Sequence, residues 1–482
     1  MPDWSSSACC WAVGDDGCVR ITVDSPARHQ ADAVRQRHIS ARELLDLHLE
    51  RIAQLNPRLT AIVSLDEERA RAGAAAADDH LARGWPVGPL HGLPFAVKDT
   101  HDVAGWRTTY GSPLFADHVP DRDHLVVERI RRAGAVLIGR TNVPEFAAGS
   151  HTFNRVFGTT RNPVDPSRSA GGSSGGAAAA LAGGMVPLAD GSDMGGSLRN
   201  PASFCGVVGL RPSLGRVPGW PSANQWEATA VSGPLARNVG DAALLLSVLA
   251  GPDPRVPMAL GDPGSTFCPP LQGSLVGLRV GWTSDLGGML DVDHRVAAVV
   301  EEAGRTMVRA GAHVYSGHPD LALADDTFRT LRAWNFQAGL GELLRQHPGA
   351  IKESLADNIR AGASLTGADV ARAYEQRTAL SETMREFFGD YDVLALPVSQ
   401  VPPFAVEEEY PTEINGRPMA DYLSWMRSAY LISVTGCPAI SVPAGTTPEG
   451  WPVGLQLVAP HGQDRRLLEV ASAYELARAV GV

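Results

Sequence analysis

Short runs of consecutive apolar residues alternate along the chain with segments of helical periodicity. Several of these runs are apolar at every position, which is typical of strands that helices cover on both faces. The pattern predicts an α/β fold built on a large mixed, mostly parallel sheet with helices on both faces. The expected strands are residues 93–97, 135–139, 185–189, 207–210, 278–282, 393–397, 440–443 and 455–458.

Helical patterns precede and separate these runs. The first extends from residue 25 to about residue 55, and within it Ser40 and Glu43 form a capping box ahead of an apolar face. Further helices are expected at 66–83, 125–133 and 241–249.

The same pattern suggests how the chain is divided. Residues 1–24 have no regular pattern and are expected to form an N-terminal extension. Residues 25–482 are expected to form a single domain. Within that domain, residues from about 285 to 390 are predicted to be a mainly helical insert or cap.

Composition and charge narrow the function classes. The chain has 482 residues, 44% of them hydrophobic and 20% charged, which is a globular composition. A formal net charge of −11 argues against nucleic acid as a partner. No apolar run reaches about 18 residues, so no membrane span is expected. The acidic N-terminus lacks the pattern of a secretory signal, and a cytoplasmic protein is predicted.

The cysteines and histidines do not suggest a metal centre. None of the six cysteines lies in a C-x-x-C motif, and the 14 histidines form neither H-E-x-x-H nor H-x-H. We therefore expect no metal site and no cofactor.

Lysine is rare in this chain, which uses arginine for nearly all its positive charge. Of 42 basic residues only Lys98 and Lys352 are lysines. Lys98 ends an apolar run that contains Phe95 and Val97. A desolvated lysine can lose its proton whereas arginine cannot, so Lys98 is a candidate base. The alternative is a surface lysine paired with Asp99.

Two glycine-rich loops each carry a serine. Ser173 lies in the GGSSGG segment at 171–176, just before an alanine-rich helix, and Ser197 ends the DMGGS segment at 193–197. Glycine lets backbone N–H groups approach a ligand closely, so residues 194–197 offer an oxyanion hole beside a hydroxyl. Residues 171–175 also match G-x-S-x-G, but the turn-rich stretch before them lacks the strand that a nucleophile elbow requires.

The motifs around these residues closely resemble those of the amidase signature family. They read GLPFAVKD at 92–99, GGSSGG at 171–176 and DMGGSLR at 193–199. The resemblance covers the chain from about residue 40 to the C-terminus, except for the helical stretch near 285–390. It implies the amidase signature fold and an amide hydrolase without a cofactor. Further blocks match in the family's order at 139–146, 206–218, 233–237, 435–443 and 454–457.

Carried over position by position, the resemblance implies a Ser–Ser–Lys triad. Ser197 becomes the nucleophile, Ser173 the bridging serine on a cis peptide bond, and Lys98 the base at the end of the relay. The oxyanion hole falls on the backbone amides of Met194, Gly195, Gly196 and Ser197. Positions that match structural residues of the family are Ser174, Asp193 and Arg199.

The substrate is less well defined. Small or aryl amides are expected, and carbamates stay open because the same oxyanion chemistry serves them. The candidates for the substrate pocket are Phe146, Gly149, His151 and Trp226. Ordinary packing is the alternative for each of them, and for His151 and Trp226 the two explanations are even. The helical region near 285–390, with Trp334 and Phe336, is either a lid or a hydrophobic subdomain.

Two other functions compete with a stand-alone amidase. One is the amidase subunit of a tRNA-dependent amidotransferase, but residues 218–226 do not resemble that subgroup. The other is a silent scaffold, which the three intact triad positions disfavour. The expected partner is a small-molecule amide or carbamate, and a homodimer stays open.

Overall fold

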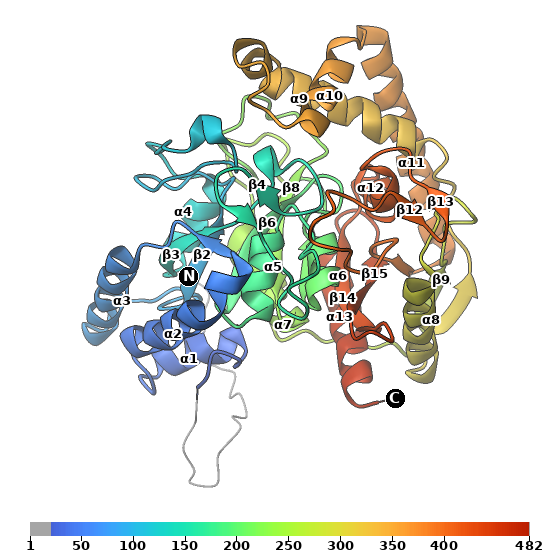
Figure 1. Cartoon of the computed structure of the whole chain (residues 1–482). Helices are drawn as coiled ribbons and strands as arrows, with labels where there is room; N and C mark the ends of the chain where they lie inside the picture. The colour runs from blue at the N-terminus through green and yellow to red at the C-terminus, as the bar shows by residue number, and fades with distance from the viewer. Residues whose placement is uncertain (1–20, 482) are drawn as a thin grey trace.

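The computed structural model describes residues 21–481, and its centre is one sheet of eleven strands (Figure 1). Across the sheet the strand order is β1-β3-β2-β6-β8-β7-β14-β15-β11-β9-β10. Its strands are β1 Ile62–Val63, β2 Pro94–Lys98, β3 Val136–Thr141, β6 Leu188–Asp193, β7 Val208–Arg211, β8 Val231–Ala236, β9 Arg279–Trp282, β10 His313–Ser316, β11 Val393–Pro397, β14 Ala439–Thr446 and β15 Pro452–Val458. Two small hairpin sheets pair β4 Phe153–Asn154 with β5 Gly158–Thr159 and β12 Glu413–Ile414 with β13 Arg417–Pro418.

The sheet is mixed, as predicted, but the expected majority of parallel pairings is wrong. Four pairings are parallel, those of β2 with β3 and β6 and those of β9 with β10 and β11. The other six pairings in this sheet are antiparallel. One antiparallel pairing, that of β14 with β15, follows from a short connection. Both strands extend beyond the apolar runs that predicted them, so only residues 447–451 separate them. Five residues are too few for the crossover that a parallel pair needs.

Every predicted strand is present, whereas β1, β8 and β10 of the main sheet and the short hairpin strands β4, β5, β12 and β13 were not predicted. β8 contains Pro234, which weakens a strand pattern because proline cannot donate to the ladder. β10 is largely exposed at the edge of the sheet and carries polar residues, so it lacks an apolar run.

The predicted helices are also present. Ser40 and Glu43 form the expected capping box, with the Glu43 amide donating to Ser40 Oγ at 3.1 Å, and this cap starts a second helix within the predicted 25–55 segment. The α-helices are α1 Ala27–Arg35, α2 Ala41–Leu59, α3 Glu67–Ala82, α4 Leu125–Arg132, α5 Gly175–Ala182, α6 Arg199–Cys205, α7 Val239–Leu249, α8 His294–Arg309, α9 Ala324–Gln346, α10 Glu353–Ala363, α11 Gly367–Asp390, α12 Arg427–Ser433 and α13 Asp464–Ala479. No helix in this described part is long and apolar enough to cross a membrane.

Glycines on the central strands let α6 lie close against one face of the sheet. A Cβ at Gly209 or Gly454 would contact α6, at Ala202 or Ser203 respectively. The alternate residues Ile440 and Val442 of β14 are buried in the main hydrophobic core with Leu467 and Leu468 of α13, a helix that packs on β14. Helices therefore cover both faces of the sheet, as predicted.

The region from 285 to 390 is mainly helical, as predicted, but it is not one unit. α8 packs on β11, β14 and β15, and β10 extends the main sheet. The helices α10 and α11 both pack on α9, and the three lie at the top of Figure 1. The predicted N-terminal extension, residues 1–24, falls almost wholly outside the described residues, and the division into domains stays a prediction.

The close packing of Gly176 on α5 predicts that a larger residue at this position destabilises the fold. A Cβ at Gly176 would come within 2.6 Å of the Ala61 carbonyl oxygen and closer still to the Asn142 amide. Gly176→Ala should therefore lower the free energy of unfolding by about 1–3 kcal/mol, measured by chemical denaturation.

A matched control lies on α9. Gly339 is exposed and has nothing within 4 Å of its Cβ position, so Gly339→Ala should be neutral or stabilise by up to about 1 kcal/mol. Equal stability of Gly176→Ala and the wild type would contradict the packing.

Candidate active site

The candidate site forms where two parallel strands end side by side. β2 ends at Lys98 and its parallel neighbour β6 ends at Asp193, with Ala96 paired to Ala189. The carboxyl ends of parallel strands meet at the same edge of a sheet, which is where α/β enzymes place their sites. The serine loops that precede α5 and α6 reach the same edge.

The Lys98 amine is fully buried among hydroxyl groups. Its side chain is 0% exposed, and Nζ donates to the Oγ atoms of Ser173, Ser174 and Ser192, each at 2.9 Å. No carboxylate of the described residues lies within 4.0 Å of Nζ. Asp190 is bonded instead to the Lys98 backbone amide, at 3.0 Å.

This setting changes the acidity of the amine. Burial lowers the pKa of Lys98 from 10.5 to about 7, and the charges of Asp190 and Asp193 oppose the shift only partly. Near neutral pH a substantial fraction of Lys98 is therefore uncharged and able to accept a proton.

The loop that carries Ser173 is fixed by its surroundings. The Gly172–Ser173 peptide bond is cis, as the family resemblance implied. The carbonyl oxygens of Gly171 and Gly172 accept hydrogen bonds from Thr152 Oγ1 at 2.8 Å and Ser150 Oγ at 2.7 Å. This glycine-rich segment is therefore a tightly held loop and not a flexible turn.

Ser197 lies beside that loop, just before α6. Its side chain is 8% exposed, and its carbonyl oxygen accepts the Ser174 amide at 3.2 Å. Within the described residues its Oγ makes no hydrogen bond, including none to Ser173 Oγ. The nucleophile candidate is thus held next to the Ser173–Lys98 pair with its hydroxyl uncommitted.

One predicted oxyanion donor is already occupied. The Gly196 amide donates to Asp193 Oδ1 at 2.8 Å. In this conformation it is not available to a substrate oxyanion, which leaves three of the four expected donors. Asp193 is the strand-end carboxylate that anchors the loop, and the loop folds back over it. Across residues 21–481 we find no acceptor for the amides of Met194, Gly195 and Ser197.

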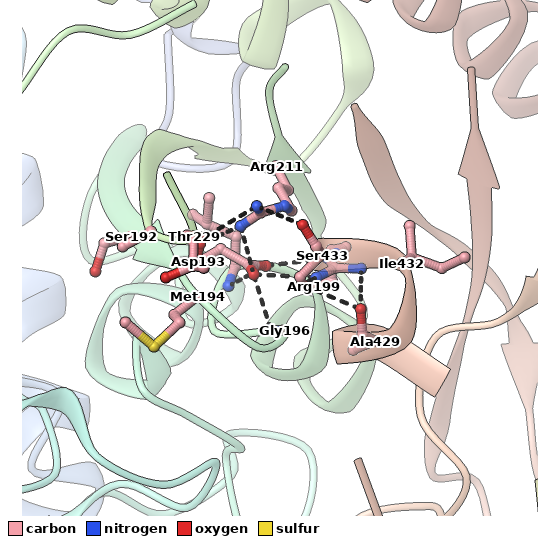
Figure 2. Close-up of polar contacts among 12 residues, drawn as sticks. Ser192, Asp193, Met194, Gly196, Arg199, Arg211, Thr229, Ala429, Ile432 and Ser433 are labelled. Carbon is pink, nitrogen blue, oxygen red and sulfur yellow. Dashed lines mark hydrogen bonds and ion pairs between the residues drawn. The ribbon is translucent and has the colours of Figure 1, made fainter. Parts of the chain in front are cut away.

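Asp193 joins the strand end, the loop and two helices through buried arginines (Figure 2). Its carboxylate accepts Arg199 Nε and Nη2, each at 3.0 Å, and Arg211 Nη1 at 3.3 Å. Arg199 Nη1 also donates to the Ala429 carbonyl of α12 at 2.9 Å, and Nη2 to Ser433 Oγ at 2.6 Å. The predicted structural role of Asp193 and Arg199 is consistent with these contacts.

Electrostatics keep this carboxylate charged. Burial alone would raise the pKa of Asp193, but Arg199 and Arg211 lower it well below its usual range. Asp193 is therefore ionised near neutral pH, where Arg199 and Arg211 compensate its charge.

The predicted pocket residues lie in different environments. Phe146 packs against a small hydrophobic cluster that includes Ile351 and Leu355, and Phe336 of α9 packs against the same cluster. Gly149 faces Lys352, whose Nζ would be 3.3 Å from a Cβ there. These two positions line the junction between the serine loops and the α9–α10 region.

The other two pocket candidates fit the role less well. His151 is buried, and its ring nitrogens bond to Ser169 Oγ at 2.7 Å and to the Val406 carbonyl at 3.1 Å, so it braces the loop. Burial lowers its pKa to about 4. Trp226 is 66% exposed and has no ring contact with another described residue.

Ser192 and Asp190 were missed by the sequence-based prediction, although both contact Lys98. The sequence does contain a signal for them. In β6 the apolar residues Leu188 and Ala189 are followed by the charged residue Asp190, which is unusual inside a buried strand. Asp190 also bonds to His101 Nδ1 at 2.5 Å. Among residues 21–481 no group of three or more His, Cys, Asp or Glu side chains is placed to hold a metal ion.

Comparison with known proteins identifies the class. The Amidase family model matches residues 43–468. The chain belongs to the amidase family, and it is a hydrolase of amide C–N bonds.

Individual relatives support the same class. The chain is 35% identical to an acylamidase of Rhodococcus erythropolis, over 94% of this chain and 95% of the relative. It is 37% identical to a glutamyl-tRNA(Gln) amidotransferase subunit of Prochlorococcus marinus, over 91% and 94%. The crystal structure of a bacterial aryl acylamidase of the amidase signature family superposes with a TM-score of 0.87 at 30% identity, covering 94% of this chain and 96% of that one. The expected amidase signature fold is thereby confirmed.

The Asp193 network makes a second stability prediction. Asp193→Asn would leave Arg199 and Arg211 buried without a counterion, and it should lower the free energy of unfolding by about 3–5 kcal/mol. Denaturant titration would measure this change.

Asp262→Asn is the matched control. Asp262 also pairs with a buried arginine, Arg216, but is itself 57% exposed, so its loss should cost less than about 1 kcal/mol. Similar losses in both variants would argue against a special role for the buried pair.

Proposed function

We propose that the chain is a stand-alone amidase that cleaves small or aryl amides through an acyl-enzyme on Ser197. The observation that carries this proposal is the buried Lys98 amine, 2.9 Å from Ser173 Oγ and without a contacting carboxylate. An amine in this setting serves as a base at neutral pH, which no arginine of the chain can do.

The first step transfers a proton along the relay. The neutral Lys98 Nζ accepts the proton of Ser173, and Ser173 Oγ takes the proton of Ser197. At the same time Ser197 Oγ forms a bond to the carbonyl carbon of the substrate. The Ser197–Ser173 hydrogen bond closes in this step, as catalytic bonds often do only with substrate bound.

The developing negative charge on the carbonyl oxygen needs donors. We assign this role to the uncommitted amides of Met194, Gly195 and Ser197, which lie at the end of β6. Asp193 keeps these amides in place by holding the amide of Gly196.

The second step breaks the C–N bond. The proton returns from Lys98 through Ser173 to the departing nitrogen, which leaves as a neutral amine. Water then attacks the acyl-enzyme with its proton passed to the same relay, which releases the carboxylic acid and restores Ser197.

The substrate class follows the relatives. The acylamidase and aryl acylamidase that this chain resembles act, by their names, on acylated amines. The hydrophobic contacts of Phe146 and Phe336 are compatible with an aromatic group nearby. Carbamates remain in the proposed range because attack on their carbonyl builds the same oxyanion.

An amidotransferase subunit is the second candidate, since several relatives carry that name. It predicts glutaminase activity and purification with a partner protein. Hydrolysis of anilides by the isolated chain, without glutaminase activity, decides for the stand-alone amidase.

A panel of anilides, aliphatic amides and carbamates tests the proposal, together with a fluorophosphonate probe. Ser197 should be the labelled residue in peptide mass spectrometry, and Ser197→Ala should lose both labelling and turnover. Turnover by Ser197→Ala at the wild-type rate would refute the assignment of the nucleophile.

The role of Lys98 as the base can be tested by mutation, and the second lysine of the chain, Lys352, provides the control. Lys98→Arg keeps a long basic side chain but one that cannot lose its proton, so kcat on an anilide should fall by at least about a hundredfold. Lys352→Arg changes the only other lysine in the same way and should keep measurable turnover. Equal activity of Lys98→Arg and the wild type would exclude the relay.

The pKa of Lys98 predicts the pH profile. Because only neutral Lys98 accepts a proton, kcat/KM should rise with pH up to about 7 and level off above it. Stopped assays of aniline release between pH 5 and 9 would measure this limb. A flat profile down to pH 5 would contradict a lysine base.

A further inference from the structure

One buried arginine differs from all the others in the described part of the chain. Arg140, Arg199, Arg211 and Arg216 are each fully buried or nearly so, and each lies within 3.3 Å of an aspartate oxygen. Arg332 on α9 is 4% exposed, yet no carboxylate of residues 21–481 lies within 4.0 Å of its guanidinium.

The guanidinium of Arg332 has few partners of any kind. Its Nη2 donates to the hydroxyl of Tyr422 at 2.6 Å, and Nη1 contacts Met194 Sδ, a weak acceptor, at 3.5 Å. Its Nε has no hydrogen-bond partner. The carbon of the guanidinium lies 4.4 Å from the ring centre of Phe336. A buried cation with unused donors is costly unless an anion completes it.

This arginine lies over the oxyanion loop, residues 194–197. Phe328 is one turn before Arg332 on the same face of α9, and a Cβ at Gly195 would come within 2.9 Å of its ring. Arg332 itself contacts Met194, three residues before Ser197. One turn further along, Phe336 packs against the same hydrophobic cluster as Phe146. The stripe Phe328–Arg332–Phe336 therefore faces the segment that would hold the substrate.

Acidic side chains on neighbouring segments are engaged elsewhere. Glu227 accepts Asn335 Nδ2 at 2.8 Å, and Asp421 accepts Arg329 Nη1 at 2.6 Å. Glu145 Oε2 accepts the Lys352 amide at 2.8 Å, and Glu409 accepts Ser354 Oγ at 2.8 Å. None of them neutralises Arg332 within the described residues.

We propose that Arg332 is a specificity-determining residue that binds a carboxylate of the amide substrate beside the oxyanion loop. This inference rests on the proposed amidase function and narrows it to anionic substrates. The planar guanidinium suits a carboxylate, because its parallel N–H groups match the two oxygens. The carboxylate can belong to the acyl part or to the amine part of the substrate.

Two matched substrate pairs separate these sources. Succinyl 4-nitroanilide and butyryl 4-nitroanilide differ by a carboxylate or a methyl group on the acyl part. N-acetyl-4-aminobenzoate and N-acetyl-4-toluidine differ in the same way on the amine part. Values of kcat/KM are measured for the wild type, Arg332→Met and Arg345→Met, since Arg345 is an exposed arginine on the same helix.

We expect the wild type to prefer the anionic member of at least one pair. Arg332→Met should reduce that preference roughly 30-fold or more, with the neutral member changed little, which also shows that the variant is folded. Arg345→Met should keep the wild-type preference.

Two results would overturn the proposal. Wild-type enzyme that hydrolyses the neutral members at least as well in both pairs has no carboxylate site at Arg332. If Arg332→Met keeps the preference for the anionic substrate, the carboxylate binds to another residue and not to Arg332. If none of the four amides is hydrolysed and Ser197 is not labelled by a fluorophosphonate, the proposed amidase function itself fails and this inference falls with it.

Discussion

The site depends on an amine that is buried without a carboxylate contact. An isolated ammonium taken out of water costs several kcal/mol, so the protein lowers the pKa of Lys98 and lets the amine become neutral. Three serine hydroxyls then satisfy the amine at 2.9 Å. Elsewhere the chain uses arginine for nearly every positive charge, which fits this requirement, since arginine stays protonated in any such setting.

The fold brings the parts together by strand geometry. Lys98 and Asp193 end two neighbouring parallel strands. The Ser197 loop follows directly from Asp193, and the Ser173 loop, which precedes α5, reaches the same edge of the sheet. Side-chain hydrogen bonds hold the glycine backbone of both loops. Asp193 accepts the Gly196 amide in the oxyanion loop, and Ser150 and Thr152 donate to the glycine carbonyl oxygens of the Ser173 loop. In the buried Asp193–Arg199–Arg211 cluster both arginines contact the one carboxylate, which lowers the cost of burying these charges next to the loop.

The sequence allowed prediction of the α/β class, the positions of most strands and helices, and the contact of Lys98 with Ser173, because apolar runs and glycine loops are local signals. It did not allow prediction of strand direction, because pairing depends on connection lengths such as 447–451 that apolar runs do not define. The occupied amide of Gly196, the contacts of Ser192 and the solitary charge of Arg332 arise from residues distant in sequence. The exposure of Trp226 could not be predicted either, because the burial of an aromatic residue in a loop depends on contacts with segments distant in sequence.

The state of the Lys98 amine is open to direct measurement, because the chain has only two lysines. Protein without an added tag, labelled with carbon-13 at lysine Cε, should give two NMR signals, and Lys352→Arg assigns them. We predict that the Lys98 signal titrates near pH 7, while burial places the pKa of Lys352 at about 8. A Lys98 signal that stays in the charged form up to about pH 10, the ordinary range of lysine, would contradict the account.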